Sequence, residues 1–331
     1  MGRRLLLALS LGVSSTTLLH VLDQHIRTSI ERTGRTGYEL YVLFIDKSSI
    51  SIDENNNLSD LFGLWTGAYP RHSYYKISLE DVFLQELNTT EHGSSLPNLP
   101  HHIALPDSTA SRSDHLRTLF SSLSSPSSKI DIVSVLQTRL IVAKAKELKC
   151  ETVIWGDSTT RLAERTLTET AKGRGFSLPW QTSDGIMPHG ITFLFPMREL
   201  FRRELHAFSM LTSPPLTPLI AESSQSSAVV ASSKDTTIDD LMGQYFASVE
   251  ENYPSIVANV VRTTNKLKPS PQPGLSTICS ICNVHIAPGT DGLYGWGGNT
   301  QVATSTTRYS EMICYGCSRS ILGSKLESSV S

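Results

Sequence analysis

The four cysteines near the end of the sequence have the spacing that indicates chemistry most specifically. They form two C-x-x-C pairs, "CSIC" at Cys279 and Cys282 and "CYGC" at Cys314 and Cys317. Each pair places two thiolates across a tight turn, and two such turns complete the four-thiolate site that zinc accepts. Four thiolates leave no open position for a substrate, so we predict a structural zinc; adjacent free cysteines are the alternative.

The stretch "ALSLGVSSTTLLH" from Ala8 to His20 is the second candidate for chemistry. An apolar run, a Gly/Ser turn and a helix start expose unpaired amides to an anion at the positive end of the helix dipole. The stretch lacks the Gly-Lys-Ser/Thr of a Walker loop. It resembles the S-G-G-x-D-S loop of PP-loop ATP pyrophosphatases, with Leu11 in place of a glycine and Ser14 in place of the aspartate. The alternative is an ordinary helix capped by hydroxyl residues.

The composition of the chain restricts its partners and its compartment. The 331 residues carry a formal net charge of -2, so contact with a nucleic acid must come from a local basic patch or a partner. The odd number of cysteines, five, argues against full oxidation and predicts a cytosolic protein. The opening "MGRRLLLALSLGV" resembles a secretory signal, so a secreted protein is an alternative. However, no small-residue cleavage site follows promptly, and the run is too short to span a membrane.

Apolar runs alternate with helical patterns in the first two thirds of the chain. We expect five strands, at residues 5–10, 38–46, 73–79, 151–156 and 189–197. Continuous apolar strands joined by helices are typical of a parallel sheet that is covered on both faces. The pattern predicts a doubly wound, mainly parallel five-stranded α/β sheet, and the resemblance of the Ala8–His20 stretch implies the PP-loop ATP pyrophosphatase type. Its ligands would lie at the carboxyl ends of the strands.

The remaining segments predict insertions, a linker and a small module. Residues 47–128 are expected to be mostly solvated insertions, with a helix or two near 79–87 and 114–123. The predicted organisation has three parts: an α/β domain at 1–212, a flexible linker at 213–236, and at 237–331 a helical pair followed by a zinc-ribbon-like cysteine module.

A longer pattern links these segments to a known family. "GDSTTRLAERTLTETAKGRGFSLPW" at 156–180, with "LSLGVSS", "FPMREL", "PSIVANVVRTTNKL" and the terminal cysteine pairs, resembles the cytoplasmic tRNA 2-thiolation protein 2 family. The resemblance runs in order from Leu5 to about Cys317. Members of that family usually carry a further N-terminal segment with its own cysteine pairs, whereas this chain begins almost at the first strand. We therefore expect a truncated sequence, with any second zinc site outside it.

The resemblance implies one half of a cytoplasmic, heterodimeric tRNA thiolase that does not involve a membrane. The other half is a catalytic PP-loop paralogue, cytoplasmic tRNA 2-thiolation protein 1. Their complex adenylates C2 of the wobble uridine in tRNAs for Lys, Glu and Gln. It then adds sulfur from a thiocarboxylated ubiquitin-related modifier, which yields 5-methoxycarbonylmethyl-2-thiouridine. A link to conjugation of that modifier to proteins, called urmylation, is also implied.

The resemblance also reveals departures from an active enzyme. Catalytic relatives have G-H-N-A-D-D where this chain has "GDSTTR", so Asp157 occupies the place of the histidine, and Thr160 and Arg161 replace the two acids. Active thiolases use a pair of cysteines beside the nucleotide, and only Cys150 remains for that role. Without these carboxylates a divalent metal on the pyrophosphate is poorly held. We predict no catalytic residues and no productive use of ATP; an active ATP-dependent adenylating sulfurtransferase is the alternative. The degenerate cofactor loop then comprises Ser10, Gly12, Ser14, Ser15, Gly156 and Asp157.

Because we predict no catalysis, we expect this chain to bind tRNA. The candidates for phosphate contact with tRNA are basic residues in and after the Gly156 segment: Arg161, Arg165, Lys172, Arg174 and Arg198. In "TAKGRGFSLPW" glycines flank the cations, and Phe176 and Trp180 offer stacking surfaces. Interleaved glutamates leave an alternative open, in which the cations form solvated ion pairs on helix faces. We expect His189 to be a strand-edge histidine and Cys150 a small core residue.

Overall fold

A six-stranded sheet forms the centre of the computed structural model, which describes residues 2–50, 58–87, 111–123, 125–221, 236–268, 277–279, 281–286 and 313–322. The strand order is β3-β2-β1-β4-β6-β5. Five strands are parallel: β1 (Arg3–Leu9), β2 (Tyr38–Asp46), β3 (Ser73–Ser78), β4 (Thr152–Trp155) and β6 (Thr192–Leu194). The two-residue β5 (Gly185–Ile186) pairs antiparallel with β6. The predicted mainly parallel α/β fold is confirmed, with β5 as a sixth strand too short to show a sequence period.

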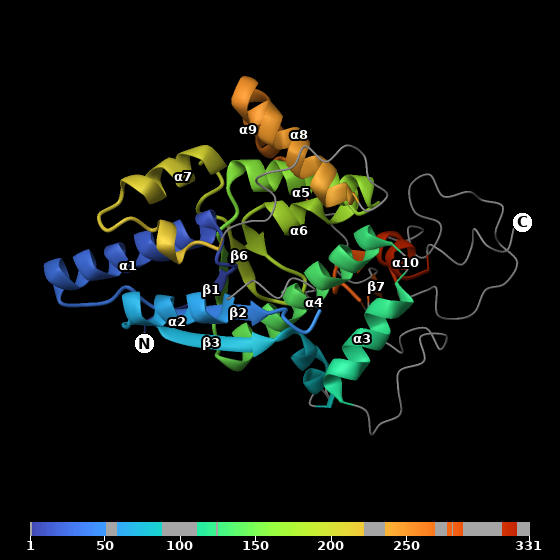
Figure 1. Ribbon diagram of the computed structural model, residues 1–331, viewed down its shortest axis with the longest axis horizontal. Helices are drawn as coiled ribbons and strands as arrows, with labels where there is room; N and C mark the ends of the chain where they lie inside the picture. The colour runs from blue at the N-terminus through green and yellow to red at the C-terminus, as the bar shows by residue number, and fades with distance from the viewer. Residues whose placement is uncertain are drawn as a thin grey trace, which may run out of the picture.

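Helices cover both faces of the sheet (Figure 1). Three lie on one face: α1 (Val13–Thr33), α2 (Leu58–Ala68) and α7 (Arg202–Leu211). Three lie on the other: α3 (Arg112–Ser122), α4 (Pro126–Glu147) and α5 (Thr159–Ala171). β1 sends Leu7 and Leu9 into the first layer and Leu6 and Ala8 into the second. Because the strand order reverses between β1 and β4, the carboxyl ends of these strands form the switch point at which α/β sheets bind ligands.

The apolar run near the N-terminus, which resembles a secretory signal, forms the central strand β1. Its last four residues, 6–9, are buried, and β1 pairs with β2 along its whole length and with β4 over four residues. Among the helices in the described ranges, none combines the length and apolar character that a bilayer span requires.

The segment 47–128 contributes more to the core than its composition predicts. Trp65 of α2 is fully buried, and the 3-10 helix η1 (Leu79–Leu87) buries Leu79. The expectation of mostly solvated insertions is therefore wrong for α2. In the sequence, three asparagines precede α2 and two glycines interrupt it, so the helical spacing of Leu58, Phe62 and Trp65 is hard to recognise. The expected helices near 79–87 and 114–123 are confirmed as η1 and α3, while residues 51–57, 88–110 and 124 lie outside the described ranges.

The C-terminal helices pack against the α/β core. The remaining elements are η2 (Gly175–Ser177), α6 (Leu178–Thr182), η3 (Thr217–Leu219), α8 (Ile238–Asn252), α9 (Pro254–Thr264), β7 (Thr277–Ile278), β8 (His285–Ile286) and α10 (Tyr315–Leu322). α8 and α9 lie over α5, and α10 lies beside α4 (Figure 1). Of the expected linker, residues 213–221 are described and pack on α2, where Trp65 Nε1 donates to the Leu219 carbonyl at 2.8 Å. Residues 222–235 lie outside the described part, and the domain boundaries stay predictions.

Candidate functional site

The degenerate loop lies at the switch point, between the end of β1 and the start of α1. Ser15 holds it together, because its Oγ donates to the Gly12 carbonyl (3.2 Å) and accepts the Ser10 N–H (3.3 Å). Gly12 is the N-cap of α1, so the expected hydroxyl cap is absent; Ser14 follows, half-buried. At the end of β4, a Cβ on Gly156 would lie 2.6 Å from Ser15 Cα, so only glycine permits this close approach.

Leu11 makes the loop part of the hydrophobic core. Its φ is 62°, in the left-handed region where glycine is free of strain and other residues are not. The side chain is fully buried in the hydrophobic cluster on the α1 face of the sheet. The Leu11 carbonyl accepts the N–H of Ala221 at 2.9 Å. The loop thus holds a backbone conformation that suits glycine at a position whose leucine side chain fills the core.

Thr160, one of the two positions at which catalytic relatives carry an acid, joins α5 to α8 and to the start of α7. Thr160 is fully buried; its Oγ1 donates to the Glu250 carboxylate of α8 at 2.6 Å and accepts the Arg202 N–H at 3.1 Å. One turn later, Glu164 is 2% exposed and pairs with Arg161 at 2.9 Å and Arg202 at 3.0 Å. Both buried carboxylates at this end of α5 therefore have protein partners already.

The five candidates for tRNA contact all form ion pairs, but at very different depths. Their side-chain exposure falls in this order: Arg161 46%, Arg165 23%, Arg198 13%, Lys172 7% and Arg174 2%. Arg165 pairs with Asp157 at 2.9 Å, and Arg198 with Asp184 at 3.3 Å. A cation must reach solvent to contact a phosphate. Lys172 and Arg174 do not suit the phosphate contact predicted for them, because both are buried and turn inward to Asp131 of α4.

Arg174 connects α4 and α5 to the cysteine cluster. Both of its Nη atoms bond to Asp131, one of them at 2.5 Å, and its Nη2 lies 3.7 Å from Cys317 Sγ. Burial alone would lower the pKa of Arg174, but its attraction to Cys317 and its bonds to the Asp131 carboxylate outweigh burial and raise the pKa well above its usual value. Gly173, with a φ of 80°, packs against the Tyr315 ring and leaves no room for a Cβ. The segment 172–175 therefore packs against the cysteine module, through Arg174 beside Cys317 and Gly173 against Tyr315.

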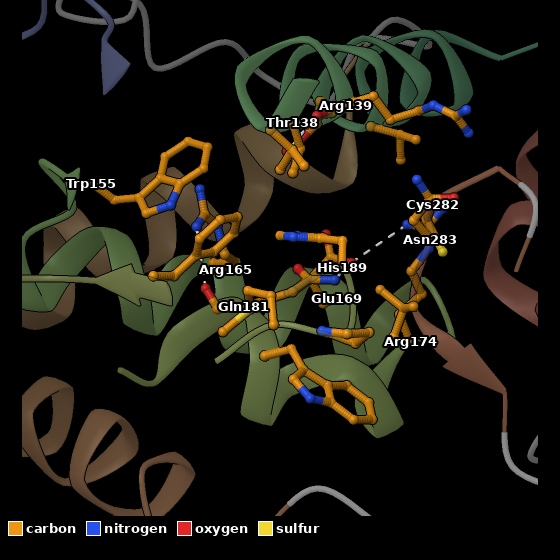
Figure 2. A pocket seen from close by; sticks show the side chains of 18 of the residues that line it. Thr138, Arg139, Trp155, Arg165, Glu169, Arg174, Gln181, His189, Cys282 and Asn283 are labelled. Atoms are coloured by element: carbon orange, nitrogen blue, oxygen red, sulfur yellow. Dashed lines mark hydrogen bonds and ion pairs between the residues drawn. The ribbon is translucent and has the colours of Figure 1, made fainter. Parts of the chain in front are cut away.

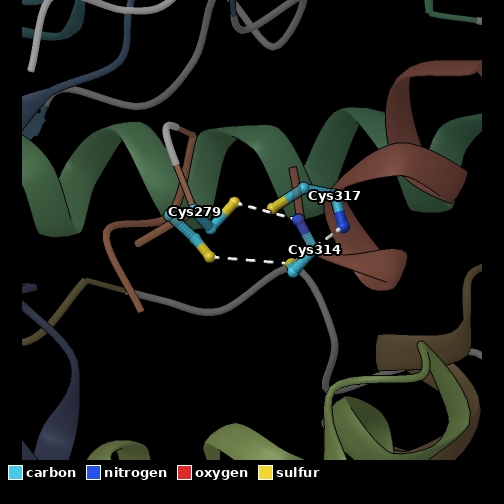
Figure 3. Close-up of side chains that lie close together, drawn as sticks. Cys279, Cys314 and Cys317 are labelled. Carbon is cyan, nitrogen blue, oxygen red and sulfur yellow. Dashed lines mark hydrogen bonds between the residues drawn. The ribbon is translucent and has the colours of Figure 1, made fainter. Parts of the chain in front are cut away.

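The four terminal cysteines converge as the sequence predicts. Figure 3 shows sulfur atoms turned toward one another beside the start of α10, and all four lie within 4.8 Å of each other. The Sγ atoms of Cys282 and Cys314 are 3.8 Å apart. A Zn–S bond of about 2.3 Å gives a tetrahedron with edges of about 3.8 Å. The set therefore suits one tetrahedral ion, whereas cysteines that hold separate irons of a cluster stand further apart.

The thiols of the cluster are not equivalent. Hydrogen bonds from the neighbouring thiols lower the pKa of Cys279, while bonds to Cys279 raise the pKa of Cys282 and Cys317. Protons held on these thiols would leave when an ion binds. Cys150 lies at the amino end of β4, away from the loop; it is 5% exposed, and burial raises its pKa to about 11. It is a core residue, as predicted. The edge where the carboxyl ends of β1, β2 and β4 meet, here called the rim of the sheet, offers no thiolate pair.

Three functional side chains were not found from sequence. Burial and the positive charge of Arg161 lower the pKa of Lys47, which follows β2 at the same rim as the degenerate loop. Its position after a strand end was the available signal. Asp131 and Glu250 are nearly fully buried carboxylates on helices. The signal for Asp131 was its place between Ile130 and Ile132 in an apolar stretch.

Sequence relatives decide the family. The cytoplasmic tRNA 2-thiolation protein 2 of Phaeosphaeria nodorum is 44% identical over 323 residues, which cover 96% of this chain and 81% of the relative. This chain belongs to the cytoplasmic tRNA 2-thiolation protein 2 family. The protein of that name from Pyrenophora tritici-repentis is 43% identical over 96% of this chain and 82% of its own length. The family model described as cytoplasmic tRNA 2-thiolation protein 2 matches residues 237–319. The family name agrees with the cytosolic compartment predicted from the cysteines.

A solved structure supports the fold of this family member. The U34-tRNA thiolase NcsA from Methanococcus maripaludis, solved with its [4Fe-4S] cluster, has a TM-score of 0.53 to this chain at 13% identity. The similarity covers 85% of this chain and 76% of NcsA. At this identity the likeness establishes the fold alone. An iron–sulfur cluster does not fit the rim here, because Cys150 is the one cysteine outside the terminal cluster.

Proposed function

We propose that this chain is the non-catalytic, tRNA-binding subunit of a cytoplasmic tRNA thiolase, needed for 2-thiolation of the wobble uridine in tRNAs for Lys, Glu and Gln. Its partner is the catalytic PP-loop paralogue, cytoplasmic tRNA 2-thiolation protein 1. The sulfur comes from a thiocarboxylated ubiquitin-related modifier, and the proposal includes a link to urmylation. Family membership along 96% of the chain supports the pathway, and the state of the rim supports the non-catalytic role.

The hydrogen bond between Thr160 and Glu250 is the main support for the proposed non-catalytic role. Adenylation requires a divalent ion to neutralise the phosphates, and the ion requires carboxylate oxygens. Here a hydroxyl stands at an acid position and donates to a buried carboxylate at 2.6 Å. Two cations, Lys47 and Arg161, lie at the same rim and influence each other. Their charge opposes the binding of a divalent cation.

The cysteine cluster has a structural role in this proposal. Cys279, Cys282, Cys314 and Cys317 would hold a zinc ion that fixes the C-terminal module and takes no part in the reaction. The buried Arg174 beside Cys317 offsets part of the negative charge that four thiolates bring.

Exposed cations without a carboxylate partner are the residues best suited to tRNA contact. Arg262, Lys266 and Lys268 lie at and after the end of α9, are exposed, and form no ion pair within the described ranges. Together these three side chains form a basic edge at the end of α9, and we assign phosphate contact to them.

Thiolation with purified components tests the catalytic half of the proposal. The chain alone, with ATP, tRNA for Lys and the thiocarboxylated modifier, is expected to form neither adenylated tRNA nor 2-thiouridine. Addition of the paralogue is expected to restore both, and the paralogue alone is expected to be impaired. Formation of 2-thiouridine by this chain without its paralogue would overturn the proposal in favour of an active sulfurtransferase.

Charge reversal tests the binding half. Replacing Arg262, Lys266 and Lys268 by glutamate should weaken tRNA binding by the heterodimer at least tenfold and flatten its salt dependence. A matched control reverses Arg27, Arg32 and Arg35, which are exposed around the end of α1 and give the same change in net charge. Equal losses in both triple variants would mean that only net charge matters and that the basic edge is not the contact.

A further inference from the structure

The turn that follows α5 lies between the cysteine cluster and α8. Lys172 caps α5, and Gly173 and Arg174 come next. A Cβ on Gly173 would lie 2.5 Å from the ring of Tyr315, the first residue of α10. A Cβ on Gly316 would overlap the side chain of Arg174. Both glycines thus allow the start of α10 to pack directly on this turn.

Arg174 and Asp131 join the start of α10 to α4. Both side chains are 2% exposed, and both Nη atoms of Arg174 bond to the Asp131 carboxylate. On the side of the cluster, Arg174 Nη2 lies 3.7 Å from Cys317 Sγ. Ser320, about one turn further along α10, donates its hydroxyl to the same carboxylate. α10 therefore contributes two of the groups that surround this buried ion pair.

The other cysteine pair also contacts the α/β core. Arg139 of α4 donates from Nη1 to the carbonyl of Ile281, which lies between Cys279 and Cys282 in the chain, at 2.9 Å. Figure 2 shows Arg139, Arg174 and Cys282 at the same end of a cavity that all three line. A metal ion that joins both cysteine pairs would tie these two contacts to each other.

On its other side, the same turn contacts the start of α8. Lys172 Nζ lies 2.8 Å from the carboxylate of Asp239, in the first turn of α8, and 3.5 Å from that of Asp131. The Lys172 side chain is 7% exposed, so solvent and salt screen these attractions little. Ser127 of α4 accepts the N–H of Ile238 at 3.2 Å. The start of α8 is therefore linked through Lys172 to the carboxylate that receives Arg174.

The helix pair α8 and α9 connects this point to the basic edge. α8 packs against α5 and α9, and only Tyr253 separates α8 from α9 in the chain. Arg262, Lys266 and Lys268, which form the basic edge, lie at and after the end of α9. We therefore expect the two helices to shift as a pair and to carry the basic edge with them.

We propose that a metal ion in the cysteine cluster fixes the position of α8 and α9, so that the cluster acts as a metal-dependent clamp on the basic edge. The clamp consists of five residues in a row: Cys317, Arg174, Asp131, Lys172 and Asp239. With the metal bound, the start of α10 is fixed and holds Arg174 against Asp131. Loss of the metal separates the two cysteine pairs and lets α10 leave the turn, which loosens Lys172 and with it α8. The role of the basic edge in tRNA contact rests on the proposed function, but the coupling between the cluster and the helices does not.

Hydrogen exchange of the full chain, with one equivalent of zinc and after its removal by a chelator, tests the clamp. Removal should speed amide exchange in α8 and α9 at least tenfold, as well as in α10, and leave β1 and β2 unchanged. Lys172→Met keeps a long side chain but cuts the link to Asp239. In this variant the metal content should stay at one equivalent, while exchange in α8 and α9 should be fast and no longer respond to the metal. Asp239→Asn, a milder change at the other end of the same ion pair, should have the same effect.

A control variant and the distribution of the effect decide the outcome. Lys129→Met removes an exposed cation of α4 and should keep the full response to the metal. Circular dichroism of each variant confirms that it folds. If α10 alone responds to metal removal, the cluster holds only its own module and the clamp is refuted.

Two further results would also refute the clamp. Equal acceleration in β1 and β2 would mean that the metal stabilises the whole fold, and a full metal response in both Lys172→Met and Asp239→Asn would exclude the ion pairs as the route. These measurements use no tRNA. Their failure would therefore leave the proposed function intact, since charge reversal of the basic edge tests that function separately.

Discussion

The rim of the sheet and the cysteine cluster contain the two sequence motifs of this chain. The two regions differ in what surrounds their polar groups. At the rim, a position where catalytic relatives carry an acid has a protein partner, since Thr160 donates to Glu250. In the cluster, four sulfur atoms converge within 4.8 Å, and they face one another, the cation of Arg174 and the backbone N–H groups of Cys314 and Cys317. The rim satisfies its polar atoms internally, which agrees with the proposed non-catalytic role. The cluster gathers four sulfur atoms at a spacing that suits a single metal ion.

Loss of one cysteine should have the largest effect on this comparison. Cys314→Ser removes one of four thiolates, and structural zinc contributes about 10–16 kcal/mol in isolated finger peptides. We expect metal content to fall from one equivalent to nearly none, with faster amide exchange in α10 and little change in the sheet. Elemental analysis and hydrogen exchange measure both effects. Cys150→Ser is the control and should keep the metal; unchanged metal in Cys314→Ser would refute the four-thiolate site.

Replacement of Arg174, the cation beside the cluster, should have the second largest effect. Arg174→Met keeps most of the buried volume but leaves Asp131 with only Lys172, 3.5 Å away, as a cationic partner. Breaking a buried ion pair costs about 3–5 kcal/mol. Urea unfolding of the zinc-loaded chain should show this loss, together with faster release of zinc to a chelator. Arg262→Met, an exposed cation without an ion pair in the described ranges, should change the stability by less than about 0.5 kcal/mol.

At the rim, Thr160→Val should cost stability and nothing else. The substitution keeps the shape of the side chain but removes the donor to the Glu250 carboxylate, at a cost of about 1–3 kcal/mol. Thr263→Val, exposed on α9, is the matched control and should be nearly neutral. Measured ATP affinity should be negligible in both. Detectable ATP binding that disappears in Thr160→Val would mean that the rim still works as a nucleotide site.

The sequence was most informative where the signal is local. Buried parallel strands are continuous apolar runs, so "YELYVLFID" was found with its observed bounds, Tyr38–Asp46. The degenerate loop was placed correctly because a strand, a glycine turn and a helix start follow one another within a dozen residues. The cysteine spacing likewise predicted the cluster that the structure brings together.

Other features depend on contacts between distant segments. Arg174 resembles an exposed cation between glycines, and nothing nearby in sequence reveals that Asp131, 43 residues away, and Cys317, 143 residues away, surround it. The hydroxyl of Thr160 finds its carboxylate 90 residues later. α2 was missed for a different reason, since Gly63 and Gly67 have poor helix propensity and burial of Trp65 overrides it.

The smallest expected effect is the difference in stability between two substitutions of Leu11, the loop residue that stands where PP-loop relatives carry a glycine. Leu11→Ala should cost about 2–5 kcal/mol because it empties part of the core. Leu11→Gly empties slightly more but relieves the left-handed backbone, which costs a non-glycine residue about 1–2 kcal/mol. The glycine variant should therefore be as stable as the alanine variant or more so, by up to about 1 kcal/mol, in paired urea titrations. A glycine variant clearly less stable than alanine would argue against a strained Leu11. Gain of ATP binding by Leu11→Gly alone would place the lost function in this one side chain rather than in the missing acids.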